Sequence, residues 1–183
     1  MRKLSVFMMT TLDGYFQGPH GELPFHGGDA ESDEFAVQQQ DDANTLLFGR
    51  RTYEMMAAYW PTSMAAANSP ELAATMNRSA KIVFSDTLPE ASWENTLLIR
   101  GSAAEAIRAL KQQPGGNLVI LGSSALTASL LNEGLVDTLD MMVHPILLGS
   151  GNPVFEKVTG LPLRLIHSRP FRSGKILLTY EPK

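Results

Sequence analysis

The chain has 183 residues, 44% of them hydrophobic, and a formal net charge of −4 at pH 7. This length favours one domain with a real core, so we expect residues 1–183 to form a single domain. The acidic balance excludes a general nucleic-acid-binding protein but allows a local basic site. The absence of cysteine excludes disulfides, thiolate catalysis and cysteine-ligated metals.

Apolar runs bounded by turn residues predict strands, and amphipathic segments predict helices. In chain order the sequence predicts a strand over Leu4–Met9, a helix over 29–42, a strand over Thr45–Phe48, helices over Thr52–Tyr59 and from Ser69 to Arg78, strands over Ala80–Phe84 and Thr96–Ile99, a helix from Ser102 that ends before Pro114, a strand over Leu118–Leu121, a helix from Gly122 to Leu131, and strands over Leu135–Val143, Leu163–Ser168 and Lys175–Tyr180.

The first apolar run, Leu4–Met9, is too short for a signal-peptide core or a membrane span. We therefore expect a cytoplasmic protein without membrane association.

Serines are expected at two helix starts. Ser32 is the expected cap of the first helix, which Phe35 anchors, and Ser102 with Glu105 forms a capping-box pattern.

The order of these elements predicts the fold class. Strands and helices alternate in the first two thirds of the chain, which predicts a parallel sheet with right-handed crossovers. The strand-only remainder predicts antiparallel strands added at an edge. We therefore predict a three-layer α/β domain with a mixed, mostly parallel sheet.

The most informative motif follows the strand Thr45–Phe48. The apolar run stops at Gly49, and Arg50, Arg51 and Thr52 follow where a helical pattern begins. A helix N-terminus offers unpaired N–H groups with partial positive charge, and arginine offers a planar donor fork for phosphate oxygens. The motif predicts a phosphorylated ligand, such as a nucleotide cofactor. The alternative is a surface turn with two solvated arginines.

A second strand-to-helix turn has the same character. The strand Leu118–Leu121 leads into Gly122-Ser123-Ser124, with small residues at the helix start. Ligands of parallel sheets bind beyond the carboxyl ends of the strands, where glycine permits close approach to a diphosphate. Together the two turns predict a nucleotide site.

Two arginines also indicate which nucleotide binds. NADP carries a 2′-phosphate that NAD lacks, and Arg50 with Arg51 supplies compact positive charge for it. A charge-assisted hydrogen bond contributes roughly 1.5–3 kcal/mol, so two would favour NADPH over NADH by roughly some hundreds-fold or more if both arginines reach that phosphate. Ser85, just after the strand Ala80–Phe84, could bind the same phosphate or serve as a simple turn residue.

Two carboxylates are candidates for the catalytic acid. Asp33 lies in the first turn of a predicted helix, where the helix dipole alone also favours an acid. Asp13 lies in Leu12-Asp13-Gly14, where a turn role is the alternative. No metal site is predicted, since the histidines lack metal-pair spacing. No Gly-x-Ser-x-Gly elbow is present, which disfavours a serine hydrolase.

Six short motifs also share their order and spacing with a known superfamily. They are Thr11–Tyr15, Leu47–Glu54, Lys81–Ser85, Val119–Ser124, Leu135–Asp137 and Pro145–Gly151. Over nearly its whole length the chain thereby resembles the dihydrofolate-reductase-like superfamily, and within it the C-terminal reductase domain of the bifunctional riboflavin-biosynthesis deaminase/reductase.

This resemblance implies a dihydrofolate-reductase-like fold, NADPH as hydride donor and a homodimer. Asp33, 16 residues before Gly49, matches the position of the pterin-binding acid of dihydrofolate reductases. Substrate contacts are expected around Asp13, Pro24-Phe25-His26 and Gly149–Gly151. The expected cofactor-binding residues are Gly49, Arg50, Arg51, Thr52, Ser85, Gly122, Ser123, Ser124, Ala125 and Leu126.

Two features depart from the superfamily pattern. The second turn is often Gly-Gly there and is Gly122-Ser123 here, and the serine side chain narrows the approach of a diphosphate. The zinc-dependent deaminase domain of the riboflavin enzyme has no counterpart in a chain without cysteine, so we expect a stand-alone reductase-like domain.

The sequence thus predicts an NADPH-dependent reductase of a small molecule. Hydride would go to a C=N or C=O carbon of a pyrimidine- or pterin-type heterocycle or its ribosyl derivative, with Asp33, or a water that it holds, supplying the proton. This reaction resembles that of 5-amino-6-(5-phosphoribosylamino)uracil reductase. Two alternatives are a true dihydrofolate reductase and a non-catalytic NADP(H)-binding module.

Overall fold

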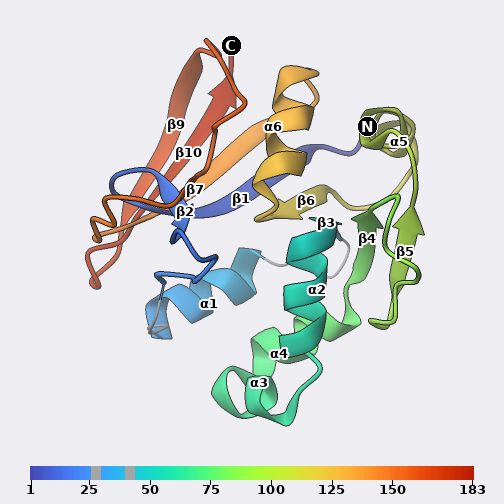
Figure 1. The fold of residues 1–183 in the computed structure, drawn as a ribbon, viewed down its shortest axis with the longest axis horizontal. Helices are drawn as coiled ribbons and strands as arrows, with labels where there is room; N and C mark the ends of the chain where they lie inside the picture. The colour runs from blue at the N-terminus through green and yellow to red at the C-terminus, as the bar shows by residue number, and fades with distance from the viewer. Residues whose placement is uncertain (26–29, 40–43) are drawn as a thin grey trace.

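The computed structural model describes residues 1–25, 30–39 and 44–183 (Figure 1). Its main sheet, within these ranges, contains β1 (Leu4–Thr11), β3 (Thr45–Gly49), β4 (Ala80–Phe84), β5 (Thr96–Ile99), β6 (Leu118–Leu121), β7 (Thr138–His144), β9 (Leu163–Pro170) and β10 (Ile176–Pro182). The strand order is β5-β4-β3-β6-β1-β7-β10-β9. A separate short ribbon pairs β2 (Tyr15–Gln17) antiparallel with β8 (Asn152–Pro153).

Strand directions confirm the mixed, mostly parallel sheet. Neighbouring strands from β5 to β7 pair in parallel, whereas β10 is antiparallel to both β7 and β9. The first strand of the C-terminal third, β7, is therefore parallel to β1. The reason is the helical crossover between β6 and β7, which returns the chain to the amino end of the sheet. The antiparallel pairings are those of β10 with β7 and of β10 with β9.

Helices cover both faces of the sheet and complete the predicted three layers (Figure 1). They are α1 (Ala30–Gln39), α2 (Arg50–Tyr59), α3 (Ser63–Asn68), α4 (Pro70–Arg78), α5 (Ala103–Gln112) and α6 (Ser124–Asn132). Helices α5 and α6 pack on one face, and α1, α2 and α4 on the other. None of the helices in the described ranges has the length and apolar character that crossing a membrane requires.

Alternation along the strands places the core on both faces of the sheet. In β1, Val6 and Met8 pack in the cluster that contains residues of α5 and α6. Phe7, between them, points to the opposite face and packs against the cluster of Phe35 from α1. Phe35 is therefore the apolar anchor of α1 that the sequence predicts.

Several boundaries differ from the predictions. Helix α2 begins at Arg50, two residues early, because Gly49 takes the extended N-cap conformation. Ser32 lies inside α1 and is not its cap. Ser102 caps α5 as predicted, since its Oγ accepts the N–H of Glu105 at 3.3 Å. Strand β7 begins at Thr138 because Asp137 exchanges bonds with the N–H and carbonyl of the first β1 residue.

Candidate functional site

The two glycine turns meet at one edge of the sheet. Because β3 and β6 are neighbouring parallel strands, the turns that follow them lie side by side. The Gly49 N–H donates to Ser123 Oγ at 2.8 Å. Thr52 Cγ2 lies 3.5 Å from the position that a Cβ at Gly122 would take. The predicted pairing of the two turns is therefore correct.

The helices that start at these turns lack side-chain caps. Gly49 precedes α2 and Ser123 precedes α6, and neither makes a side-chain cap bond in the described part of the chain. In contrast, Thr62 caps α3 and Ser102 caps α5 through side-chain oxygens. The first N–H groups of α2 and α6 thus remain available at two adjacent positive helix ends. This arrangement suits a diphosphate or another extended anion.

Ser123 has a strained backbone at this edge. Its φ of 58° and ψ of 63° lie in the left-handed region, which costs a side-chain-bearing residue about 1–2 kcal/mol. The bond between its Oγ and the Gly49 N–H compensates part of this cost. Such strain persists where the surroundings enforce it and occurs preferentially at functional sites. The serine side chain also occupies the gap between the turns, as expected.

The two arginines at the start of α2 differ in their surroundings. Arg50 Nε pairs with Glu54 Oε1 at 2.8 Å, and Arg50 Nη1 donates to Thr87 Oγ1 at 2.7 Å. Arg51 is exposed and has no side-chain partner among the residues described. Arg50 is thereby held toward the turn after β4, whereas Arg51 can orient toward a ligand.

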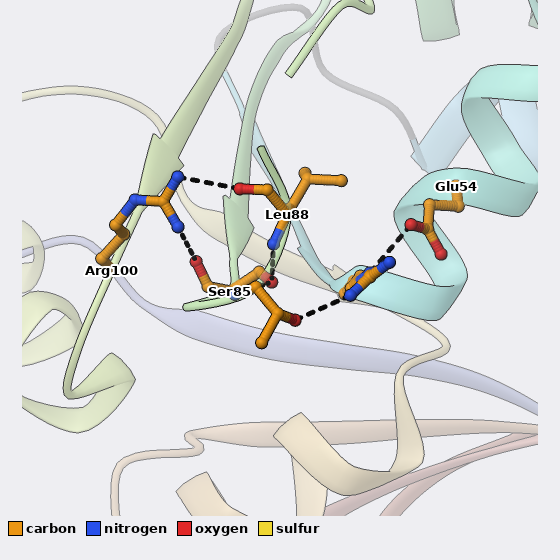
Figure 2. Close-up of polar contacts among 6 residues, drawn as sticks. Glu54, Ser85, Leu88 and Arg100 are labelled. Carbon is orange, nitrogen blue, oxygen red and sulfur yellow. Dashed lines mark hydrogen bonds and ion pairs between the residues drawn. The ribbon is translucent and has the colours of Figure 1, made fainter. Parts of the chain in front are cut away.

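The turn after β4 forms the outer rim of the site (Figure 2). Ser85 Oγ accepts the N–H groups of Leu88 at 2.9 Å and of Thr87 at 3.2 Å. Arg100 donates to the carbonyls of Ser85 at 3.4 Å and Leu88 at 2.8 Å, as Figure 2 shows. Ser85 thus has a turn role, and its hydroxyl hydrogen remains able to donate to a ligand. Sequence reasoning missed Arg100, which stabilises this turn.

An apolar cavity of about 450 Å³ extends from the turns along the sheet face that α1, α2 and α4 cover. This volume accommodates a fused-ring ligand. Thr52, Gly122 and Ser123 lie among its lining residues, so the cavity connects directly to the two turns. Its apolar walls include Phe7, Met9, Phe16, Phe25, Phe35, Met55, Met56, Trp60 and Leu121.

Asp140, in the middle of β7, is the acidic residue among the described lining of this cavity. Its Oδ1 accepts the hydroxyl of Thr179 at 2.5 Å. Burial raises the pKa of Asp140 above its usual range, and the Thr179 bond and the nearby His167 partly oppose this increase. Sequence reasoning missed Asp140, although one charged residue inside the apolar strand Thr138–His144 is a signal that could have found it.

The predicted acid candidates have different outcomes. Asp33 belongs to α1, but its side chain lies outside the described residues, as does His26. Asp13 does not line the described cavity. Its carboxylate accepts Thr11 Oγ1 at 2.6 Å and the N–H groups of Leu148 at 3.0 Å and Gly149 at 2.7 Å. The Thr11 bond is the main cause, with these N–H groups, of a lowered Asp13 pKa.

Asp13 thus joins the first turn to the loop over residues 145–151. Within this loop, Gly149 takes a φ of 76°, and Gly151 passes so near Gln17 that a Cβ would lie 2.2 Å from the Gln17 carbonyl oxygen. The loop therefore supports the β2–β8 ribbon, whereas Phe16 and Phe25 supply the cavity walls nearby. Across the described ranges, no cluster of three or more His, Asp or Glu residues could hold a metal ion.

The sequence matches the model of the RibD C-terminal domain family over residues 2–177. The chain belongs to this family. An uncharacterized relative, YyaP of Bacillus subtilis (strain 168), is 29% identical over 181 residues, which cover 98% of this chain and 95% of YyaP. The predicted family is therefore confirmed.

Solved structures show the fold of this RibD C-terminal domain protein. A protein from Shewanella sp. PV-4, provisionally assigned to riboflavin biosynthesis, has a TM-score of 0.73 at 23% identity, with 99% of each chain covered. Dihydrofolate reductase from Enterococcus faecalis, solved in complex with NADP(H), has a TM-score of 0.69 at 19% identity, with 99% and 96% of the two chains covered. The dihydrofolate-reductase-like fold is confirmed.

Proposed function

We propose that this RibD C-terminal domain protein is an NADPH-dependent reductase of a pyrimidine- or pterin-type heterocycle. The observation that carries the proposal is the meeting of two helix N-termini without side-chain caps, at Gly49 and Ser123, beside a ring-sized apolar cavity. Family membership and the names of the similar proteins support the same activity.

The residues at the turns fit the phosphates of NADPH. The diphosphate would lie across the first turns of α2 and α6 and accept their N–H groups. Thr52, Ser124 and Ala125 would contact the diphosphate as well. Leu126 is buried in the core, so it can contact the diphosphate only through its backbone. The 2′-phosphate would lie near Arg50, Arg51 and Ser85. When bound, NADPH supplies hydride.

The cavity would hold the ring that is reduced. Its apolar walls exclude water and place the acceptor carbon next to the turn at Gly122. Reduction of a C=N or C=O bond also needs one proton on the nitrogen or oxygen. Asp33 on α1, or a water that it holds, is the proposed donor.

Assembly as a homodimer is part of the proposal. Strand β9 ends the sheet and exposes Leu165 and Ile166, by 51% and 45%. An eight-residue edge strand with exposed aliphatic side chains is a typical pairing surface. Light scattering on the purified protein should give twice the chain mass of 20.0 kDa. A monomer at micromolar concentration would contradict this part.

A binding titration followed by turnover assays tests the activity. NADPH fluorescence should change saturably on binding, and NADPH should be oxidised in the presence of a pterin, pyrimidine or carbonyl compound. Turnover of dihydrofolate that Asp33→Asn abolishes would instead identify a true dihydrofolate reductase. Binding without oxidation over a broad panel would identify a non-catalytic module. Absence of NADPH binding would refute the proposal.

A further inference from the structure

The part of the chain that builds one side of the cavity carries no positive side chain. Residues 4–49 contain eight carboxylates and no lysine or arginine. This segment supplies β1, α1 and the aromatic walls Phe16 and Phe25. The described cavity lining that comes from this segment is therefore without a positive side chain.

The few cations near this face lie at one end of the cavity or are engaged elsewhere. Lys3 lies in the described lining but precedes β1, at the strand end opposite to the two turns. Arg169 pairs with Glu31 at 3.7 Å and packs against aromatic rings. Lys175 Nζ donates to Ser32 Oγ at 3.1 Å. With the first turns of α2 and α6 occupied by the cofactor, a phosphate on a substrate beside them would lose its hydration at the strand end opposite to Lys3, which is unfavourable.

Asp140 offers one polar contact in these apolar surroundings. Oδ1 accepts the Thr179 hydroxyl, which fixes the carboxyl group on β7. Oδ2 has no hydrogen-bond partner among the residues that the structure describes, and the side chain lines the cavity. In the sheet Asp140 pairs with Phe7 of β1, and Phe7 pairs with Leu121, the residue before Gly122. Asp140 therefore lies two strands from the turn, at the same level.

We propose that the substrate of this protein is an unphosphorylated, planar nitrogen heterocycle whose N–H groups donate to Asp140. The proposal rests on the proposed reductase function, since it names the substrate class of the same cavity. Asp140 acts as a positioning residue: its Oδ2 accepts a ring or amino N–H and sets the orientation of the ring. The phosphoribosyl substrates of riboflavin synthesis are excluded by charge and by the apolar lining.

Calorimetric titration of the protein without cofactor tests the Asp140 contact. The probes are 2,4-diaminoquinazoline, which has N–H donors, and quinazoline, which has none. A charge-assisted hydrogen bond corresponds to roughly ten- to hundredfold in affinity. Asp140→Asn keeps the shape of the side chain. It should lower the affinity for the diamino probe by about that factor and leave the affinity for quinazoline unchanged.

Thr179→Val is the matched control, because it removes the bond to Oδ1 and leaves Oδ2 in place. Because the carboxyl group then loses the bond that fixes it, Thr179→Val should weaken binding of the diamino probe by less than Asp140→Asn does and should leave quinazoline binding unchanged. An equal loss of affinity for both probes in Asp140→Asn, or the absence of saturable binding of the diamino probe to the wild type, would overturn the positioning role. A loss in Thr179→Val as large as that in Asp140→Asn would also overturn it.

Uridine and uridine 5′-phosphate, titrated with the two turns occupied by NADP⁺, test the exclusion of phosphate. The phosphate should weaken binding at least tenfold, and tighter binding of the phosphorylated probe than of uridine would overturn the exclusion. NADPH binding is measured separately on the same protein. If NADPH does not bind but the probe results hold, the reductase proposal fails and the Asp140 site stands. If NADPH binds and the probe results fail, only the substrate class is wrong.

Discussion

Removal of both arginines at the start of α2 should separate NADPH from NADH. In Arg50→Ala/Arg51→Ala the compact positive charge near the proposed 2′-phosphate position is lost. The N–H groups of α2 and α6, which would hold the diphosphate common to both cofactors, are unchanged. NADPH affinity should therefore fall sharply and NADH affinity should fall little.

The structure sets the size of this effect. Arg50 already pairs with Glu54 at 2.8 Å and is about half exposed, so its contribution is screened to about 1 kcal/mol. Arg51 has no competing partner among the described residues, and a charge-assisted bond from it contributes about 2 kcal/mol. The sum of about 3 kcal/mol corresponds to roughly a hundredfold weaker NADPH binding.

Fluorescence titrations at constant ionic strength measure both cofactors. Arg108→Ala is the matched control, because Arg108 of α5 forms a comparably exposed ion pair with Glu133, the residue after α6, on the opposite face of the sheet. This variant should bind NADPH as the wild type does. Equal weakening of NADPH and NADH in the double variant, or no weakening of either, would refute the reasoning about the 2′-phosphate.

Three further predictions concern the supporting structure. Lys81→Met should lower the free energy of unfolding by about 3 kcal/mol, because it leaves without a donor the three carbonyl oxygens at the end of α4 that accept from Lys81 Nζ, those of Met76, Asn77 and Ser79. Burial lowers the Lys81 pKa to about 8, so on raising the pH the folded protein releases this proton before the unfolded chain does. In denaturant titrations, the free energy of unfolding of the wild type should therefore exceed that of Lys81→Met by about 1 kcal/mol more at pH 9 than at pH 7. Asp13→Asn should accelerate hydrogen exchange at Gly149, whereas in the wild type this contact should persist until pH falls below the ordinary aspartate pKa. Gly151→Ala should destabilise the protein by about 2 kcal/mol, since its Cβ would overlap the Gln17 carbonyl.

Each of these predictions has a contrary outcome. A Lys81→Met difference that is equal at pH 7 and pH 9 would contradict the lowered pKa. Unchanged exchange at Gly149 would contradict the role of Asp13. Gly160→Ala is the control for Gly151→Ala, because Gly160 also has a positive φ but an added Cβ meets nothing within 4 Å. Equal destabilisation by the two alanines would mean that backbone strain, and not overlap, dominates.

Local patterns predicted the parallel part of the fold well, because apolar runs between turn residues define its strands. The predicted bounds of β4, β5 and β6 agree with the structure. Helix α3 was missed because it is short and buries only Ala65. The β2–β8 ribbon was missed because it joins a three-residue and a two-residue strand that lie far apart in the sequence.

The adjacency of the two glycine turns was predicted because it depends on the strand ends, whereas contacts that depend on packing were missed. Gly49 and Gly122 could be paired from the order of the elements alone. The role of Asp13 as a link to a distant loop depends on the path of residues 145–151, which no local pattern specifies. Asp140 was missed because its position in the cavity depends on which strands pair with β7.

Amide chemical shifts during an NADPH titration test the central claim most directly. The isotope-labelled protein is within reach of such spectra, both as the chain of 20.0 kDa and as the proposed homodimer of twice that mass. Saturable binding should produce its largest shift changes at residues 49–52 and 122–126, where the two helix N-termini meet. An absence of saturable change, or changes confined to other parts of the protein, would contradict the claim that these turns form the cofactor site.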